Sequence, residues 1–261
     1  MWQVLRSIYI WSAIAFGTAF MYFLALPVFL LSAPFDRTRR FGHWYAQKWG
    51  RMILRLNNRW TFEVQHEERI PAGRPLVVVS NHQGMGDIMM AFCLELHFKW
   101  ISKRANFFVP FMGWFMYHAG YIPLRRGDKS SIEKCMGEAR RYLERGVSVL
   151  FFPEGTRSVD GVVKPFKKGA FKLALDAGCD VLPLAISGTL DALPKHTWKF
   201  SDDFAAMKLL VGEVISTRGM GEADLESLID EAREAVIALK DELDGRAPAL
   251  GAHAAKRRAV G

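Results

Sequence analysis

Residues 147–158 read VSVLFFPEGTRS, a mostly apolar run that ends in a turn of proline, glycine and polar side chains. The run is rich in β-branched and aromatic residues and is too short for a typical helix, so it predicts a buried strand followed by a polar loop. The same pattern, a short apolar run bounded by turn residues, recurs at 76–80, 121–124, 181–187 and 209–215.

Helical patterns separate these predicted strands, at 85–97, 130–145, 167–177 and 222–243. Strands that alternate with helices are typical of an α/β fold, and we therefore predict a mostly parallel sheet flanked by helices. In such sheets the chemistry gathers at the carboxyl ends of the strands. The residues that follow each strand are thus the first candidates for a functional site.

Three of these strand ends are rich in polar groups. After the first strand, Asp87 follows His82 by five residues, a spacing at which the carboxylate can hold one imidazole nitrogen and leave the other free as a general base. The pair Arg125 and Arg126 follows the predicted strand 121–124. The loop 153–158 follows the predicted strand that begins at residue 147. Taken singly, each of these three strand ends also has a purely structural interpretation: a structural histidine, a solvated arginine pair, and a Pro-Gly loop.

Taken in this order, the three strand ends resemble the motifs of the glycerolipid acyltransferase family. Residues 81–87 match its NHxxxxD motif, residues 120–126 its glycine-to-arginine motif, and residues 152–158 its FPEGTRS motif in full. Residues 181–184 look like a fourth, proline-containing block. The resemblance covers roughly residues 75–195, and the ordered set is far more specific than any single piece.

The resemblance implies an O-acyltransferase of phospholipid biosynthesis. Such an enzyme moves a fatty acyl group from acyl-CoA or acyl-carrier-protein to the sn-2 hydroxyl of 1-acyl-glycerol-3-phosphate and forms phosphatidate. The resemblance also implies that His82 and Asp87 are catalytic. Residues 83–86, Arg125 and Asp180 depart from the family pattern, so another lysolipid or glycerol-3-phosphate stays open as acceptor. The substrate-binding residues that the resemblance implies are Lys103, Arg126, Glu154, Gly155, Thr156 and Arg157.

The chemistry expected at His82 needs no nucleophile from the protein. A secondary hydroxyl is almost never ionised at neutral pH, so a positioned base must take its proton as it attacks a thioester. The sequence has no G-x-S-x-G elbow and no Walker P-loop, and its three cysteines are isolated, without metal-ligand spacing. We therefore expect neither a metal nor a cofactor, only the acyl thioester as co-substrate.

Two other functional classes remain open from the residues. One is a membrane-anchored hydrolase of thioesters or phosphoesters, in which water replaces the acceptor hydroxyl. The other is a catalytically silent lipid-binding module, against which the joint presence of His82, Asp87, Glu154 and Arg157 weighs.

The net charge of +8 is concentrated at the two ends of the chain. Residues 1–60 carry eight Lys and Arg against Asp36 alone, and residues 246–261 carry four basic side chains and no acid, so the middle is mildly acidic. This distribution argues against a nucleic-acid groove and favours an anionic membrane surface as partner.

The first segment of the chain supplies the membrane signal. Residues 7–35 contain no charged side chain and would form a helix about 43 Å long, more than the roughly 30 Å of a bilayer's hydrocarbon core. Arg37, Arg39 and Arg40 follow at once, which places the catalytic part on the cytoplasmic side of the cell membrane. A cleaved signal peptide is the alternative, but the run is about twice the usual length.

A second helix is predicted at 42–58, with an aromatic and apolar arc around Trp49 and a basic arc around Arg51. This pattern favours an amphipathic helix at the membrane interface, and ordinary packing on the domain is the alternative. We accordingly expect an anchoring helical segment at 1–60, a catalytic domain at 61–245 and a basic, disordered tail at 246–261.

Overall fold

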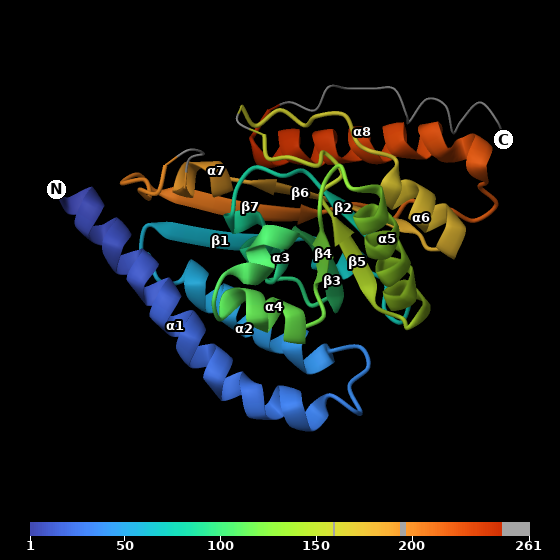
Figure 1. Cartoon of the computed structure of the whole chain (residues 1–261). Helices are drawn as coiled ribbons and strands as arrows, with labels where there is room; N and C mark the ends of the chain where they lie inside the picture. Colours follow the sequence, from blue (N-terminus) through green and yellow to red (C-terminus); the bar gives the residue numbers. More distant parts are fainter. Residues whose placement is uncertain (159, 194–196, 247–261) are drawn as a thin grey trace.

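The computed structural model describes residues 1–158, 160–193 and 197–246, and its centre is a seven-stranded sheet (Figure 1). The sheet explains the short apolar runs of the sequence, because strands covered on both faces bury every side chain. The strands are β1 (Trp60–Gln65), β2 (Val77–Ser80), β3 (Phe98–Lys103), β4 (Ile122–Leu124), β5 (Ser148–Phe151), β6 (Val181–Ser187) and β7 (Ala205–Val211).

The spatial order of the strands is β1-β7-β6-β2-β5-β3-β4. Neighbouring strands are parallel except for the antiparallel pair β6 and β7, which confirms the predicted mostly parallel sheet. Since β6, β2, β5, β3 and β4 run in one direction, their carboxyl ends meet along one edge of the sheet. The predicted polar strand ends lie on this edge.

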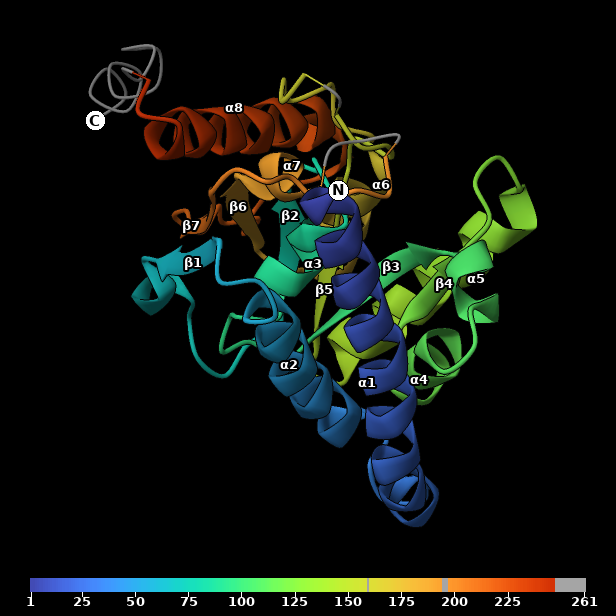
Figure 2. The same cartoon turned by 90° about the vertical axis from the view of Figure 1, so that its left-hand side faces the viewer.

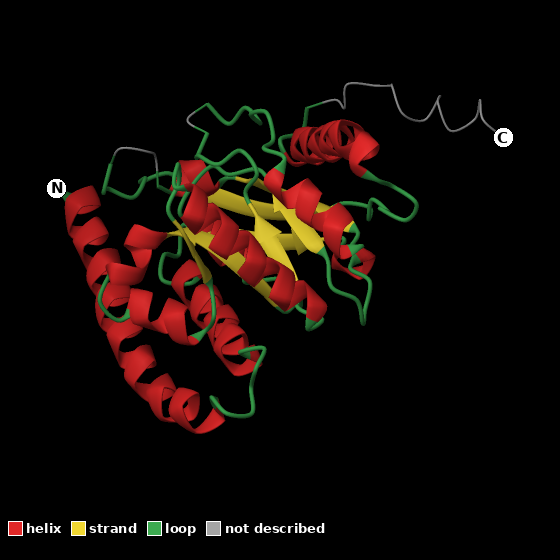
Figure 3. Cartoon of the chain, turned by 45° about the vertical axis from the view of Figure 1, so that its right-hand side comes forward, coloured by secondary structure: helices red, strands yellow, loops and turns green. Residues whose placement is uncertain are grey.

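Helices cover both faces of the sheet, as Figures 2 and 3 show. Short 3₁₀ turns lie between β1 and β2 (η1, Glu67–Arg69), between β3 and α4 (η2, Arg104–Phe108) and before α8 (η3, Glu222–Asp224). The α-helices are α1 (Trp2–Ser32), α2 (Arg40–Leu54), α3 (Gly86–Ala91), α4 (Met112–His118), α5 (Lys129–Glu144), α6 (Gly169–Ala177), α7 (Thr189–Ala192) and α8 (Leu225–Leu243).

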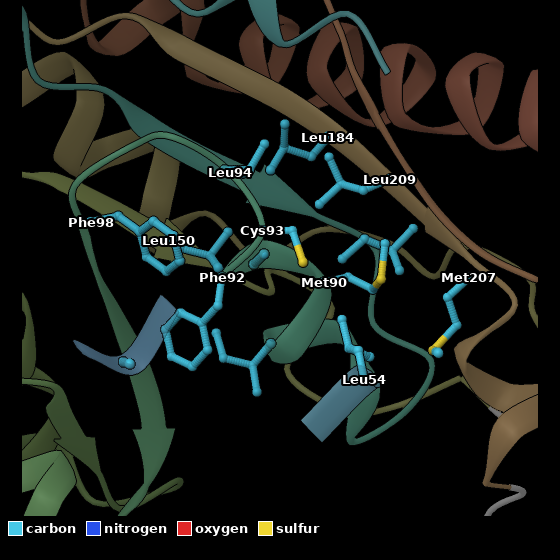
Figure 4. Packing of buried hydrophobic residues seen from close by; sticks show 14 of the residues in the cluster. Leu54, Met90, Phe92, Cys93, Leu94, Phe98, Leu150, Leu184, Met207 and Leu209 are labelled. Carbon is cyan, nitrogen blue, oxygen red and sulfur yellow. The ribbon is translucent and has the colours of Figure 1, made fainter. Parts of the chain in front are cut away.

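Two hydrophobic cores lie on opposite faces of the sheet, because successive strand residues point in opposite directions. On one face Leu150 of β5 joins a cluster with Leu54 of α2 and Phe92, which follows α3 (Figure 4). On the other face its neighbour Val149 packs in a cluster with Phe171 of α6. The face with Leu150 is the one that α2, α3 and α4 share.

Two strands were not predicted, and both have mixed composition. β3 reads FKWISK, in which two lysines interrupt the apolar run, and β1 reads WTFEVQ at the edge of the sheet. Their strand character comes from pairing with β5 and β7 and not from a local pattern. The short helices α4 and α7 were likewise not predicted.

Several predicted elements have different bounds in the structure: the helix expected at 42–58 is α2, which ends at Leu54, and the one expected at 222–243 is α8, which begins at Leu225 after η3. The strand expected at 209–215 is β7, which begins at Ala205 and ends at Val211; beyond it the Gly212 N–H still donates to the carbonyl of Pro183 at 2.9 Å, and Ile215 forms an isolated antiparallel bridge with Val181. The helix expected at 85–97 is α3, which ends at Ala91 because the next residues turn into the core. The predictions at 76–80, 130–145 and 181–187 agree with β2, α5 and β6 to within a residue.

Helix α1 contains the uncharged run and packs against the body along its length. Among the described residues it is the one helix long and apolar enough to cross a membrane. Near its start the Trp11 indole donates to the carbonyl of Trp198 at 2.7 Å, and near its end Phe29 stacks on His118 of α4 with 5.3 Å between centroids. Its outer face is exposed and apolar, including Phe16 and Phe20.

Helix α2 is amphipathic, as predicted, and its buried face packs on the domain. Ala46 and Ile53 are buried, and an added Cβ at Gly50 would lie 3.0 Å from Phe92, which shows how closely α2 approaches the segment after α3. Of the predicted basic arc, Arg51 donates to the carbonyl of Cys93 at 2.7 Å, whereas Lys48 is exposed. The basic arc is therefore divided between the domain and the surface.

Lys99 of β3 is a buried lysine between the first segment and the domain. Its ammonium nitrogen donates to the carbonyls of Arg39 at 3.0 Å and Ala119 at 2.9 Å, and it lies 5.6 Å from the ring centroids of Tyr121 and Tyr142. Burial lowers the pKa of Lys99 to about 7. Through these two hydrogen bonds, Lys99 links the turn before α2 to the end of α4.

We expect Lys99 to make the free energy of unfolding depend on pH. Between pH 7 and 8.5 the unfolded chain keeps a proton on Lys99 that the folded state has released, so the free energy of unfolding should rise with pH, by up to about 1.4 kcal/mol per unit. In Lys99→Met this contribution should vanish. Urea unfolding in detergent, followed by tryptophan fluorescence at three pH values, measures it. Both proteins share the buried cysteines, which titrate in the opposite sense, so only the difference in slope is compared; equal slopes would contradict the expectation.

Candidate active site

His82 and Asp87 form a hydrogen-bonded pair at the end of the central strand β2. The Nδ1 atom of His82 lies 2.6 Å from Oδ2 of Asp87, which stands in the first turn of α3. The imidazole is about one-fifth exposed, whereas the carboxylate is fully buried. The contact uses Nδ1 and leaves Nε2 as the ring nitrogen for a substrate, which is the geometry of a general base with an orienting acid.

The Asp87 carboxylate is enclosed by hydrogen-bond donors. Its Oδ2 accepts from the backbone N–H groups of Gln83 at 2.6 Å and Gly84 at 3.0 Å as well as from His82. Its Oδ1 accepts from the hydroxyl of Thr189. A buried carboxylate is costly unless it is hydrogen-bonded, and this set of donors compensates for the burial.

The loop after β5 holds His82 from three sides. The ring of Phe152 stacks on the imidazole with 4.3 Å between centroids. The N–H of Ser158 donates to the His82 carbonyl at 2.7 Å, and the His82 N–H donates to Oε1 of Glu154 at 2.7 Å. The two motifs that lie about 70 residues apart in sequence are thus one structural unit.

Glu154 is a buried carboxylate that bridges two backbone segments. Besides His82, it accepts from the N–H of Lys164 through Oε2 at 3.1 Å. Burial raises its pKa, and the two N–H donors oppose the shift. Both oxygens have backbone partners, so Glu154 supports the backbone of His82 and links it to the segment at Lys164.

The remaining residues of the FPEGTRS loop differ in exposure, and Ser158 is buried. Gly155 has φ of 69°, a left-handed conformation that other residues adopt only with strain, so the turn favours glycine. Thr156 is exposed and Arg157 is half-buried.

Lys103 and Arg126 lie farther along the same edge of the sheet. Lys103 ends β3 and pairs in register with Leu124 of β4, two residues before Arg126. Both side chains are exposed. With neighbouring strands about 4.8 Å apart, three steps separate the strand of His82 from that of Arg126, roughly 14 Å. His82, Asp87 and Glu154 are joined by direct contacts, and these two cations form a second group.

Three residues of this site were not among the predicted ones. Asn81 exchanges two hydrogen bonds of 2.8 Å with the backbone of Ile186, Phe152 stacks on His82, and Thr189 bonds Asp87. Phe152 was hidden because an aromatic residue at a strand end reads as core. Thr189 follows a strand end, the same signal that identified the other polar groups.

The surroundings supply no thiolate. Burial raises the pKa of Cys93 to about 11 and that of Cys135 to about 12, so both thiols stay protonated at neutral pH. Within residues 1–158, 160–193 and 197–246, no three His, Cys, Asp or Glu side chains are grouped as metal ligands would be.

Comparison with known proteins connects this geometry to a family. A family model described as Acyltransferase matches residues 61–187, which include β2, β5 and the residues described around His82 except Thr189. A 1-acyl-sn-glycerol-3-phosphate acyltransferase of Chlamydomonas reinhardtii is 39% identical over 184 residues, which make up 67% of this chain and 55% of that protein. The chain belongs to the acyltransferase family.

Other members of the family share the similarity. The human 1-acyl-sn-glycerol-3-phosphate acyltransferase beta is 32% identical over 67% of this chain and 63% of its own length. The crystal structure of the 1-acyl-sn-glycerophosphate acyltransferase PlsC from Thermotoga maritima has a TM-score of 0.74 and 27% identity, covering 94% of this chain and 97% of that one. The chain spans about half the length of the first curated relatives it matches.

Proposed function

We propose that this chain is an O-acyltransferase that moves a fatty acyl group from a thioester to the sn-2 hydroxyl of 1-acyl-glycerol-3-phosphate and forms phosphatidate. The observation that carries the proposal is the pair His82 and Asp87, with Nε2 of the imidazole left for a substrate hydroxyl. The relatives are named for this acceptor, which supports the proposal. The donor is acyl-CoA or acyl-carrier-protein, both of which present the same thioester.

The chemistry proceeds in two steps with one proton. Nε2 of His82 takes the proton of the hydroxyl while its oxygen attacks the thioester carbonyl, and Asp87 stabilises the imidazolium that forms. The tetrahedral intermediate then collapses, the C–S bond breaks, and the imidazolium returns the proton to the leaving thiolate. The histidine ends neutral, so no group of the protein is consumed.

The acceptor phosphate calls for fixed cations. A phosphomonoester carries nearly two negative charges at neutral pH, and its transfer from water requires charge-assisted hydrogen bonds in exchange. We assign this role to Arg157, Arg126 and Lys103 on the same edge of the sheet. Gly155 and Thr156 shape the loop that carries Arg157, and Glu154 fixes that loop to His82.

The direct test measures transfer and acceptor choice together. Purified protein is incubated with acyl-CoA or acyl-carrier-protein and with lysophosphatidate, glycerol-3-phosphate, a neutral lysolipid or no acceptor, and products are identified by mass. We expect phosphatidate from lysophosphatidate and little thiol release without an acceptor. Thiol release that needs no acceptor would identify a hydrolase, and no reaction at all would contradict the proposal.

We further propose that residues 1–60 attach the protein to the cytoplasmic face of the cell membrane, beside a catalytic domain at 61–245. Because α1 packs on the body near both of its ends, its exposed apolar face is free to lie in one leaflet next to the domain. Exposed aromatic side chains of α4, Trp114 and Tyr117, extend that face. Of the predicted tail 246–261, all but Arg246 lies outside the described residues.

Apolar burial should dominate this attachment over surface charge. We expect 1 M salt to leave the protein on vesicles of phosphatidylcholine and phosphatidylglycerol, whereas the double variant Phe16→Glu, Phe20→Glu should bind about 10² to 10³ times more weakly, given the free energy of burying each ring. Vesicle sedimentation measures the bound fraction. Ile132→Glu, on α5 in the opposite layer, is the matched control. Release of the wild type by salt alone would mean that α1 does not insert.

A further inference from the structure

The turn between β6 and α7 is bound to both ends of the segment 81–87. At one end Asn81 and Ile186 exchange two hydrogen bonds of 2.8 Å. At the other end, three residues after Ile186, the hydroxyl of Thr189 donates to Oδ1 of Asp87. Thr189 is 1% exposed, so solvent does not compete for this carboxylate. The turn thus spans the same two ends of the loop that His82 occupies.

Gly188 makes this return of the chain possible. Its φ is 80°, and an added Cβ would lie 2.1 Å from the carbonyl oxygen of Ala206 on β7. A side chain at this position would meet both backbone strain and a rigid neighbour. The position of Thr189 is therefore determined by the turn and the strand beneath it, and not by the loop it contacts.

Little space separates the segment 81–87 from Thr189. An added Cβ at Gly84 would lie 3.2 Å from the Thr189 carbonyl oxygen, and one at Gly86 would lie 3.3 Å from its Cβ. Each contact is tighter than a Cβ normally accepts, and the neighbour at Gly84 is backbone. The small residues between His82 and Asp87, which depart from the family pattern, match the space that Thr189 fills.

We propose that Thr189 is a positioning residue for the His82–Asp87 pair, and that Gly84 and Gly86 are small in order to admit it. Its hydroxyl occupies Oδ1, which orients the carboxylate so that Oδ2 faces Nδ1 of His82. That contact keeps the ring proton on Nδ1 and the lone pair on Nε2, as the base requires. The stiff rotamer of a β-branched residue suits this task. The effect on turnover rests on the proposed function, whereas the effect on the imidazole does not.

The first test compares hydroxyl removal with hydroxyl retention. Thr189→Val should lower kcat for acyl transfer about 10-fold to 100-fold with little change in KM, the size expected for one hydrogen bond to a charged group. Thr189→Ser should restore most of the rate. Thr217→Val is the matched control, since it also removes a buried hydroxyl, one that donates to the carbonyl of Cys179 at 3.2 Å. It should keep kcat while losing similar thermal stability.

The second test measures the tautomer of the His82 imidazole without any substrate. In protein labelled with ¹⁵N-histidine, the signals of His82 are assigned by their loss in His82→Ala. Wild type and Thr189→Ser should show the tautomer protonated on Nδ1, and Thr189→Val should show a mixture of tautomers. If the wild type transfers no acyl group, the proposed function fails, and this spectrum alone decides the role of Thr189.

The outcomes separate positioning from mere structure. A normal kcat in Thr189→Val, an equal loss in Thr189→Ser, or an unchanged His82 spectrum in Thr189→Val would each overturn the proposal. A double-mutant cycle tests the glycine: Gly84→Ala should slow the wild type but have a clearly smaller effect on kcat in the Thr189→Val background. Equal losses in both backgrounds would show that Gly84 is small for another reason.

Discussion

The His82→Ala variant should transfer acyl groups about 10² to 10⁴ times more slowly than the wild type, the usual contribution of a general base. With the imidazole gone, nothing at the end of β2 can take the proton of the attacking hydroxyl. The fold should persist, because the backbone contacts of residue 82 with Glu154 and Ser158 do not involve the ring. Initial rates of phosphatidate formation, with circular dichroism as a check on folding, measure this.

Asp87→Asn should cause a loss of similar order for a different reason. The amide oxygen can take the place of Oδ2, where it still accepts from the Gln83 and Gly84 N–H groups and from Nδ1 of His82, while the amide nitrogen lies beside the Thr189 hydroxyl. The neutral amide, however, no longer stabilises the imidazolium that forms when His82 takes the proton of the hydroxyl.

The structure offers a control for these two substitutions. His66 pairs with Glu68 at 3.0 Å on the surface, so His66→Asn breaks a comparable pair away from the site, with a residue that tolerates the positive φ of this position. It should keep full activity. Near-normal turnover by folded His82→Ala would remove the proposed mechanism.

The second large effect is expected at the cations of the acceptor site. A charge-assisted contact is worth roughly 1.5 to 3 kcal/mol, so Arg157→Ala or Arg126→Ala should reduce kcat/KM for lysophosphatidate by about one to two orders of magnitude. Lys103→Ala should act in the same direction. An uncharged lysolipid lacks the phosphate and should be far less affected.

The sheet order predicts which arginine matters more. In lysophosphatidate only a short stretch of the glycerol backbone separates the sn-2 hydroxyl from the phosphate, and Arg157 follows the strand next to that of His82, whereas Arg126 follows one three steps away. We therefore expect the larger loss in Arg157→Ala. Arg125→Ala, beside Arg126 and paired with Asp128 at 3.9 Å, is the matched control. Equal losses on both acceptors would mean that these arginines serve the fold or the acyl donor.

Local patterns in the sequence were enough to predict the elements that lie in the middle of the fold. The run 181–187 is β6 without change of bounds, because strands covered on both faces read as continuous apolar runs. The pairing of His82 with Asp87 was also predicted, since five residues across a turn into a helix leave few other arrangements. The FPEGTRS loop was recognised because its residues are contiguous.

Tertiary structure alone decided the rest. That β2 lies between β6 and β5 is a property of chain topology, and only this order brings Glu154 and Thr189 to the segment 81–87. β3, interrupted by lysines, became a strand through pairing with its neighbours. The sequence by itself therefore determined which residues we propose for the chemistry, since those signals are local. Which side chains hold them in place depended on contacts between residues about 70 to 100 positions apart, for which no local pattern exists.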